Sequence, residues 1–181
     1  MMRYRPRPTS RPSSPPKVAA VAALALGVGA CAYSTSTALL PPHLKTVAIP
    51  VFENATTEYT LEQQVTEAVI RRFVADNHLR VVDERSANSV VQGKITYYKN
   101  SVFGISEVSR AQEYRVTIGV SVVFKDLVKN REIWSDDDLV KTANYYVQDV
   151  PGDSARTELD GRKLAIAKIA DEILSRSVES W

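Results

Sequence analysis

Residues 114–125, YRVTIGVSVVFK, decide the fold because their side chains alternate between two kinds. Every second residue is apolar and lies on one face of the predicted strand: Tyr114, Val116, Ile118, Val120, Val122 and Phe124. The residues between them are mostly polar: Arg115, Thr117, Gly119, Ser121, Val123 and Lys125. An antiparallel strand with this pattern packs one face on a core and exposes the other to water or to a partner. The segment therefore predicts a sheet covered on one side only, with Ile118 central in its buried face.

Two further strands are predicted beside this segment. Before it, residues 91–97 alternate with a period of two, with Gln92, Lys94 and Thr96 on the polar face and Val91, Gly93, Ile95 and Tyr97 on the other. After it, Lys129-Asn130 marks a turn into a strand at residues 132–142, and broken alternation at Asp136-Asp137-Asp138 predicts a bulge. Residues 100–112, between the first two strands, form either a mobile loop or a longer hairpin that extends from the sheet.

Two helices are predicted from apolar residues at helical spacing. The first begins with a capping box at Thr60 and Gln63, ends near Asp76, and buries a stripe that recurs every four residues: Leu61, Val65, Val69 and Phe73. The second starts after Asp153 or Ser154 and runs to Trp181. Its broad apolar stripe consists of Leu164, Ala167, Ile169, Ala170, Ile173, Leu174 and Val178.

Short strands are also predicted on either side of the first helix, at residues 47–51 and 79–82. Pro50 has no N–H for a strand ladder, so it places the first of these at a sheet edge or at a bulge. The complete order is β-α-β-β-β-α. It predicts an α+β fold, a two-layer sandwich in which a small mixed β-sheet has two α-helices packed on one face. We expect a single domain at residues 46–181, preceded by a lipidated N-terminal tether at residues 31–45.

Residues 1–30 are predicted to be a secretory signal peptide with a lipobox. The uncharged run VAAVAALALGVGA at residues 18–30 is shorter than the about 20 apolar residues that span a membrane. It leads into Val28-Gly29-Ala30-Cys31, which resembles a bacterial lipobox, and Cys31 is the only cysteine of the chain. We expect Cys31 to take a diacylglycerol and a further acyl chain such as palmitate. The alternative is a plain buried cysteine beside a signal peptide that is cut nearby.

The distribution of charge argues against nucleic acid as a partner. Residues 1–30 hold five of the 23 basic residues and no acidic residue, so the rest of the chain has 18 basic against 21 acidic residues, a net charge of −3. A nucleic-acid-binding domain would need a basic surface there. With one cysteine, the chain forms neither an intrachain disulfide nor a zinc cluster built on thiolates.

Residues suited to catalysis are few. The two histidines are His43, in the tether, and His78, just after a helix, and the sequence has neither a G-x-S-x-G motif nor a glycine-rich phosphate loop. The run Asp136-Asp137-Asp138 does not converge on a cation without a bulge, because adjacent strand residues point to opposite faces; a solvated strand edge is favoured. We therefore expect no enzymatic activity, no metal site and no cofactor.

The polar faces of the strands are the predicted binding surface. They bring cations near aromatic rings: Lys94, Lys99, Arg115 and Lys125 with Tyr98 and Phe103. Such a surface binds anionic phosphates through the cations and sugars or acyl chains through the rings. The alternative is an ordinary solvated sheet face.

Residues 31–181 resemble the LptE-like family of lipopolysaccharide-assembly lipoproteins of the Gram-negative outer membrane. The resemblance rests on the order of short motifs: Cys31-Ala32-Tyr33-Ser34, Leu40-Pro41-Pro42-His43-Leu44-Lys45-Thr46-Val47-Ala48-Ile49-Pro50, Phe52-Glu53-Asn54, Leu61-Glu62, Leu79-Arg80-Val81-Val82, Gly93-Lys94-Ile95, Tyr114-Arg115 and Ile133-Trp134. Ala87-Asn88 stands where the family tends to have Ala-Asp, a change that affects a turn.

The resemblance implies a non-enzymatic subunit that plugs the lumen of the large β-barrel translocon LptD, assists its assembly and contacts lipopolysaccharide. It also implies a lipid anchor at the periplasmic face of the outer membrane, in agreement with Ala32 after the cysteine. The family supplies no motif for lipopolysaccharide contacts, so Lys94, Lys99, Arg110 and Arg115 are predicted from their chemistry alone. The alternative function is an envelope lipoprotein scaffold that binds peptidoglycan or another glycan.

Overall fold

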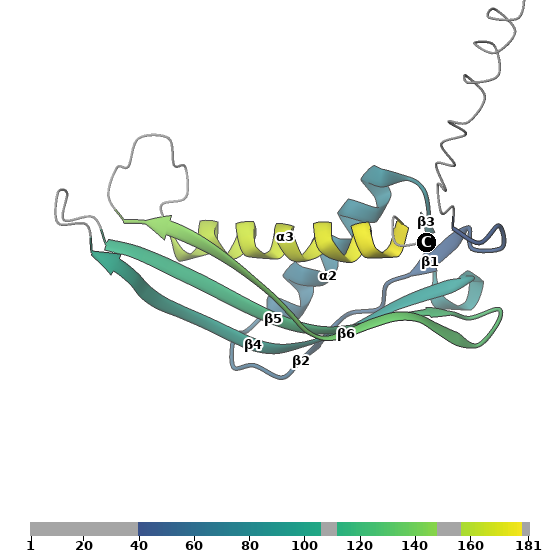
Figure 1. Ribbon diagram of the computed structural model, residues 1–181, viewed down its shortest axis with the longest axis horizontal. Coiled ribbons are helices and arrows are strands. Elements are labelled where there is room, and N and C mark those ends of the chain that lie inside the picture. The colour runs from purple at the N-terminus through teal and green to yellow at the C-terminus, as the bar shows by residue number, and fades with distance from the viewer. Residues whose placement is uncertain (1–39, 106–111, 148–156, 179–181) are drawn as a thin grey trace, which may run out of the picture. The chain divides into compact units, whose positions relative to one another are not determined.

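The structure, a computed structural model, describes residues 40–105, 112–147 and 157–178. Two helices, α2 (Leu61–Asp76) and α3 (Glu158–Val178), lie on one face of a mixed sheet, and no described helix covers the other face (Figure 1). The strands are β1 (Thr46–Ala48), β2 (Glu53–Asn54), β3 (Arg80–Val81), β4 (Ser89–Ile105), β5 (Gln112–Asp126) and β6 (Arg131–Tyr146), and a 3-10 turn, η1, spans Glu84–Ser86. The predicted α+β two-layer fold is confirmed.

The sheet has the order β3-β1-β4-β5-β6, with β2 paired to β4 farther along that strand. β4, β5 and β6 form an antiparallel meander, whereas β1 lies between β3 and β4 and is parallel to both. The prediction that Pro50 lies in an edge strand or at a bulge is wrong. β1 is an inner strand that ends at Ala48, so the missing N–H of Pro50 falls outside the ladder.

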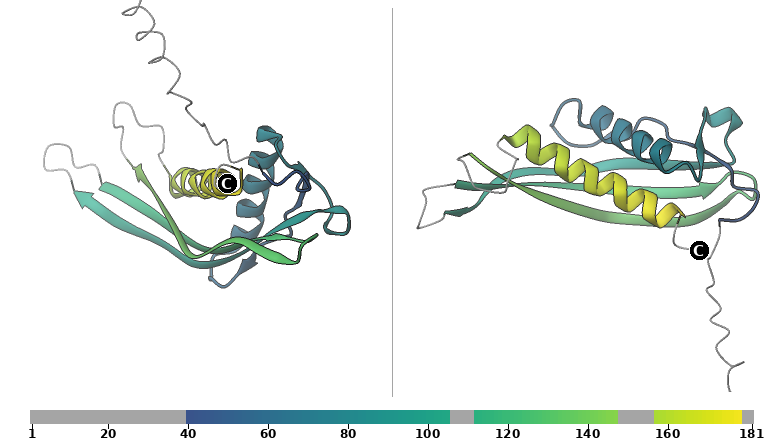
Figure 2. Two further views of the ribbon diagram at one scale, coloured as in Figure 1. Left: turned by 45° about the vertical axis from the view of Figure 1, so that its right-hand side comes forward. Right: turned by 90° about the horizontal axis from the view of Figure 1, so that it is seen from above.

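The core is built on the apolar face of β5, as its alternation predicts. Ile118 and Phe124 are fully buried there, beneath Phe73 of α2 and Ile169 of α3. The two helices also pack against each other on this side of the sheet (Figure 2). The buried position predicted for Ile118 is confirmed.

Bulges in β4 and β6 determine which side chains face the helices. The predicted bulge in β6 is confirmed, because Ser121 of β5 faces two residues of β6, Asp137 and Asp138. In β4, Thr96 is an extra residue that reverses the alternation. As a result, Tyr98 faces α3, and the prediction that it lies on the polar face is wrong; Tyr97 is the exposed ring instead.

The long connection predicted at residues 100–112 is largely paired strand. β4 continues to Ile105 and β5 starts at Gln112, so the hairpin alternative is confirmed for the paired residues. Residues 106–111 lie outside the described residues.

α2 starts at Leu61, directly after Thr60 as predicted, but without the predicted capping box, and α3 starts later than predicted. Thr60 precedes α2 with a φ of 64° and makes no side-chain capping bond, so the predicted capping box with Gln63 is wrong. A capping box occurs instead before α3, where Thr157 N–H donates to Asp160 Oδ2 (3.0 Å) and Asp160 N–H donates to Thr157 Oγ1 (3.2 Å). Asp153 and Ser154 lie outside the described residues.

The buried stripe of α3 is rotated in its first half relative to the prediction. Leu164 and Ala167 are exposed, and the buried positions are Gly161, Ala165, Ile166, Ile169, Ala170, Ile173, Leu174 and Ser177. A β-carbon on Gly161 would lie 2.9 Å from Tyr145 Cδ1, so the glycine allows α3 to approach β6 closely.

Part of the predicted tether packs on the domain. Leu44 is buried in the core, and Leu40 packs against it. Residues 1–39, which include the predicted signal peptide and Cys31, lie outside the described residues. Among the helices that the structure describes, none is both long and apolar enough to span a membrane.

Candidate functional site

The candidate site is the outer face of β4, β5 and β6, which the helices leave uncovered. Lys99 of β4 pairs with Thr117, and Arg115 of β5 pairs with Ser101, so the two cations are diagonal neighbours on this face. Diagonal neighbours in an antiparallel pair are about 7–8 Å apart. Lys94 lies five residues before Lys99 (99 − 94 = 5), or about 16 Å along an extended strand. Arg110 lies outside the described residues.

Arg115 is held in place by an aromatic ring and an amide, and no described carboxylate pairs with its charge. Its guanidinium carbon lies 3.1 Å from the centroid of the Phe103 ring, and its Nε donates to Asn144 Oδ1 over 2.8 Å. No carboxylate of the described residues forms an ion pair with it. A fixed guanidinium stacked on an aromatic ring is suited to an anionic group that approaches from the open side.

Lys99 and Lys94 differ in their surroundings. Lys99 is exposed and forms neither a hydrogen bond nor an ion pair with any described residue. Lys94 Nζ lies 3.6 Å from Glu53 Oε2, and because both side chains are largely exposed this ion pair is weak. The structure therefore brings together Lys99 and Arg115 and leaves Lys94 apart, beside an acid.

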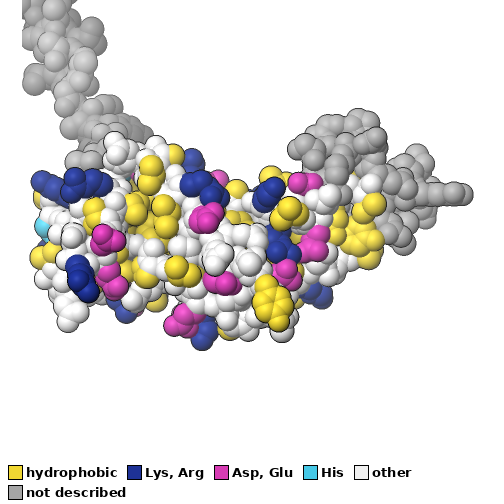
Figure 3. All heavy atoms as spheres, turned by 180° about the vertical axis from the view of Figure 1, so that it is seen from behind, with side chains coloured by type: hydrophobic (Ala, Val, Ile, Leu, Met, Phe, Trp, Pro, Cys, Tyr) yellow, Lys and Arg dark blue, Asp and Glu magenta, His cyan; other side chains and the backbone are white. Residues whose placement is uncertain are grey.

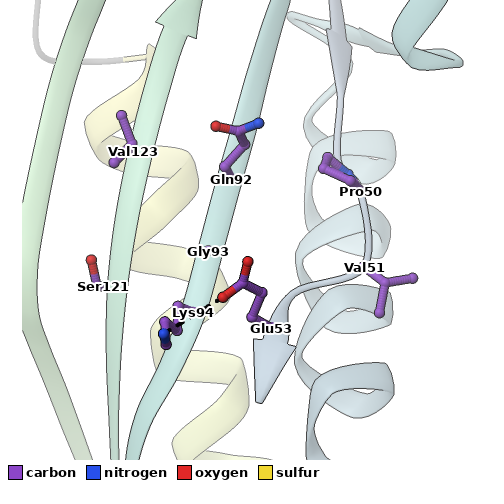
Figure 4. Close-up of a pocket in the computed structure, with 8 residues that line it drawn as sticks. All are labelled: Pro50, Val51, Glu53, Gln92, Gly93, Lys94, Ser121 and Val123. Atoms are coloured by element: carbon purple, nitrogen blue, oxygen red, sulfur yellow. Dashed lines mark ion pairs between the residues drawn. The ribbon is translucent and has the colours of Figure 1, made fainter. Parts of the chain in front are cut away.

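A shallow hollow of about 380 Å³ surrounds Lys94 where the segment between β1 and β2 runs beside β4 (Figure 4). Lys94 and Glu53 face each other across it, and Pro50, Val51, Gln92, Gly93, Ser121 and Val123 complete its lining. One cation opposite one carboxylate does not favour an anionic ligand, so this hollow does not extend the Lys99–Arg115 site.

A polar cluster on the helix side of the sheet was missed by the sequence analysis. Arg162 Nη2 donates to Glu158 Oε1 (2.7 Å) and to Glu58 Oε1 (2.5 Å), while the Tyr98 hydroxyl donates to the same Glu158 oxygen. Burial raises the pKa of Tyr98, and the hydrogen bonds from Tyr98 and Arg162 lower the pKa of Glu158. The cluster joins the start of α3 to β4 and to the loop before α2. Only the four-residue spacing of Glu158 and Arg162 is visible in the sequence.

A second missed cluster is centred on Asp126, whose side chain is fully buried. His43 Nε2 lies 2.8 Å from Asp126 Oδ2, and the N–H groups of Val128 and Lys129 each donate to Oδ1 over 3.0 Å. Burial acts to raise the pKa of this carboxyl, but the hydrogen bonds outweigh it and the pKa is lowered. The cluster attaches His43, which precedes β1, to the turn between β5 and β6.

The described residues contain no metal-binding group of three or more His, Cys, Asp or Glu side chains. At the bulge of β6, Asp136 Oδ2 accepts from Arg176 Nη1 (2.6 Å) and Asp137 Oδ1 accepts from Ser121 Oγ (3.2 Å). The two carboxylates leave the strand on opposite faces. The prediction of a solvated strand edge is confirmed for Asp137 and Asp138, which are exposed. It is wrong for Asp136, which is half-buried and forms an ion pair with Arg176 of α3.

The charged groups on one face of the domain are mixed in sign. Seen from behind, Lys and Arg side chains lie among Asp and Glu, and apolar patches lie between them (Figure 3). The described residues visible on this face form no extended basic region of the kind that binds nucleic acid.

The sequence matches the family model for lipopolysaccharide assembly, LptE, over residues 44–177, which is nearly all of the folded domain. The chain belongs to the LptE family. The resemblance inferred from the short motifs is thereby confirmed. Membership places the protein in lipopolysaccharide assembly, a role that involves no enzymatic reaction.

Solved structures are similar to this chain at low sequence identity. One is the hypothetical protein CT253 from Chlamydia trachomatis, with a TM-score of 0.50, 14% identity, and coverage of 73% of this chain and 94% of that one. A minor lipoprotein from Acinetobacter baumannii gives a TM-score of 0.44 at 13% identity, with coverage of 74% and 91%. Lipoprotein GNA1162 from Neisseria meningitidis gives 0.43 at 10% identity, with coverage of 72% and 99%. No curated protein matches the chain.

Proposed function

We propose that the protein is the lipid-anchored subunit of the lipopolysaccharide translocon, which binds an LptD-like β-barrel at the periplasmic face of the outer membrane. In this role it occupies the barrel lumen, assists barrel assembly and contacts lipopolysaccharide during delivery to the outer leaflet. The observation that supports the proposal most strongly is the family match across residues 44–177. The uncovered sheet face supplies the surface that such a partnership requires.

The composition of that face suits a barrel lumen, whose wall is polar. Thr117, Ser121 and Thr142 supply short hydroxyl side chains, and the apolar groups among them, Tyr97 and Val140, are only partly exposed. Tyr97 and Val140 lie on either side of Gly119 and form a small apolar area among these hydroxyls. A surface that mixes hydroxyls, a small apolar area and charges of both signs is typical of interfaces that stay hydrated. No large apolar patch is needed for this partner.

Lipopolysaccharide is proposed to bind where Lys99 and Arg115 meet. Its phosphates are anionic and would pair with two cations that no described carboxylate neutralises. The Phe103 ring, which Arg115 covers on one side, gives an adjacent apolar contact for sugars or acyl chains. The lipid anchor at Cys31, outside the described residues, would hold the domain at the membrane that supplies this ligand.

The experiment is site-specific photocrosslinking in intact cells, with the photoreactive residue in place of Thr117, which lies on the outer face beside Lys99. An adduct with a large β-barrel protein is expected. Adducts that contain only peptidoglycan fragments would contradict the proposal and favour the scaffold that binds peptidoglycan. A photoreactive residue in place of Leu164, which is 45% exposed on α3, serves as the control for non-specific labelling.

A further inference from the structure

The turn between β5 and β6, residues 127–130, presents apolar side chains to the surroundings. Leu127 is 41% exposed and Val128 is 59% exposed, although the strands on either side bury their apolar groups. Lys129 follows directly and its side chain forms neither a hydrogen bond nor an ion pair with any described residue. Arg131 is 52% exposed, and its Nε lies 3.7 Å from Asp126 Oδ2. The turn therefore combines two exposed apolar groups with two cations.

This turn is held in one conformation. Asp126 accepts the N–H groups of Val128 and Lys129, and Leu127 N–H donates to Asn88 O over 2.9 Å. Asn130 takes a φ of 47°, a left-handed conformation that asparagine tolerates better than most residues. The apolar pair is thus displayed by fixed backbone, so a partner that binds it has little conformational entropy to remove.

The same turn is the place to which the membrane-proximal chain is fastened. His43 bonds Asp126 itself, and Leu44, the next residue, is buried in the core. Residues 31–40 span at most about 30 Å when fully extended. A lipid anchor at Cys31 would therefore keep this end of the sheet close to the bilayer, whereas the β4–β5 hairpin is at the other end of β5.

We propose that residues 127–131 dock on the surface of an anionic phospholipid bilayer beside the lipid anchor. Leu127 and Val128 enter the boundary between headgroups and acyl chains, and Lys129 and Arg131 contact lipid phosphates. The nearest exposed acid in sequence, Glu132, accepts from Ser135 Oγ (2.5 Å) and forms no ion pair with Lys129. The proposal rests on the proposed lipid anchor, because the anchor brings this end of the domain to the membrane.

The test uses the chain that starts at residue 31 with Cys31→Ser, so that no lipid is attached. Its sedimentation with vesicles of phosphatidylethanolamine containing about a quarter phosphatidylglycerol measures the docking surface alone. Measurable binding is expected, weaker with phosphatidylcholine vesicles. The double change Leu127→Ser with Val128→Ser should reduce the partition coefficient about tenfold, and Lys129→Glu should reduce both binding and its dependence on salt.

Val102→Ser is the matched control, because Val102 is 57% exposed but lies at the opposite end of the sheet. It should leave vesicle binding unchanged, and all variants should melt like the parent chain. Absence of vesicle binding by the parent, or an equal loss with Val102→Ser, would overturn the proposal. Photocrosslinking to the barrel is a separate measurement, so the failure of one proposal is distinguishable from the failure of the other.

Discussion

The ring of Phe52 fills the space that a β-carbon on Gly93 would occupy: that atom would lie 2.1 Å from Phe52 Cε2. Gly93 is on the helix-facing side of β4, and Phe52 is buried between β1 and β2. This contact lets the N-terminal segment lie directly against the middle of the sheet. Gly93-Lys94-Ile95 and Phe52-Glu53-Asn54 are two of the motifs that identify the family, and here they have a common packing role.

Gly93→Ala is expected to destabilise the fold by about 2 kcal/mol or more, because Phe52 has to leave its site. Urea unfolding followed by circular dichroism measures the change. Gly104→Ala is the control, since the nearest atom to a β-carbon there, Glu113 Oε2, is at 3.4 Å. Equal stabilities for the two variants would show that Phe52 moves without cost.

Ile118→Asp is expected to prevent folding, because a carboxylate in a fully buried site costs several kcal/mol unless it is paired. Thermal melting is the measurement. Thr117→Asp puts the same group on the uncovered face of β5 and should shift the melting temperature little. Similar melting of both variants would mean that the two faces of β5 are wrongly assigned.

Lys99→Gln combined with Arg115→Gln is expected to weaken lipopolysaccharide binding about tenfold or more, since charge-assisted contacts to phosphate contribute about 1.5–3 kcal/mol each. Lys94→Gln should have a smaller effect, because Glu53 already lies 3.6 Å away. Binding titrations at two salt concentrations are the measurement. Unchanged affinity and salt dependence in the double variant would move the ligand site elsewhere.

Stability is expected to fall as the pH drops below about 4, partly through Asp126, whose folded-state pKa lies below the ordinary value of 3.8 for an aspartate. A lowered pKa means that the stabilising contribution is complete above the unfolded-state value and is lost as the carboxylate is protonated. Glu158 and Glu172 also have lowered pKa values and contribute with the same sign. The free energy of unfolding, measured with urea between pH 7 and pH 3, should therefore depend less on pH for Asp126→Asn than for the parent.

Cys31→Ser is expected to make the protein extractable from membranes by salt. Its melting temperature should not change. The acyl chains are the stable part of the attachment, and a single weak surface contact is readily reversed. Mass spectrometry of the natural chain should show an acylated N-terminal Cys31. An unmodified cysteine, or a mature chain that starts at another residue, would contradict the lipobox assignment.

The sequence predicted those parts of the fold that depend on local periodicity. The alternation around Ile118 and the four-residue spacing from Leu61 to Phe73 gave the correct strand face and the correct helix. Tyr98 was assigned to the wrong face because an extra residue at Thr96 leaves no mark in the pattern of hydrophobicity. The first half of α3 was misplaced because a glycine that packs closely on Tyr145 looks like a weak helix residue.

The candidate site was predictable only in part. Arg115 was found because a cation on the polar face of a strand is visible in the alternation. Lys99 lies on the same face only because Thr96 is an extra residue, and the period of residues 91–97 continued without a bulge puts it on the opposite face. The partners of Arg162 and His43 were not predictable, because Glu58 and Asp126 lie 104 and 83 residues away from them. Such contacts follow from the docking of whole elements and have no local signature.

The bulge at Asp137 and Asp138 of β6 also limits the pairing of this strand with a second copy of the chain. β6 ends the sheet, and a long strand in that position exposes a row of amide and carbonyl groups that another chain can pair with. The bulge interrupts this row midway and adds two exposed carboxylates. Separate copies of the chain are thereby protected against edge-to-edge pairing of their sheets.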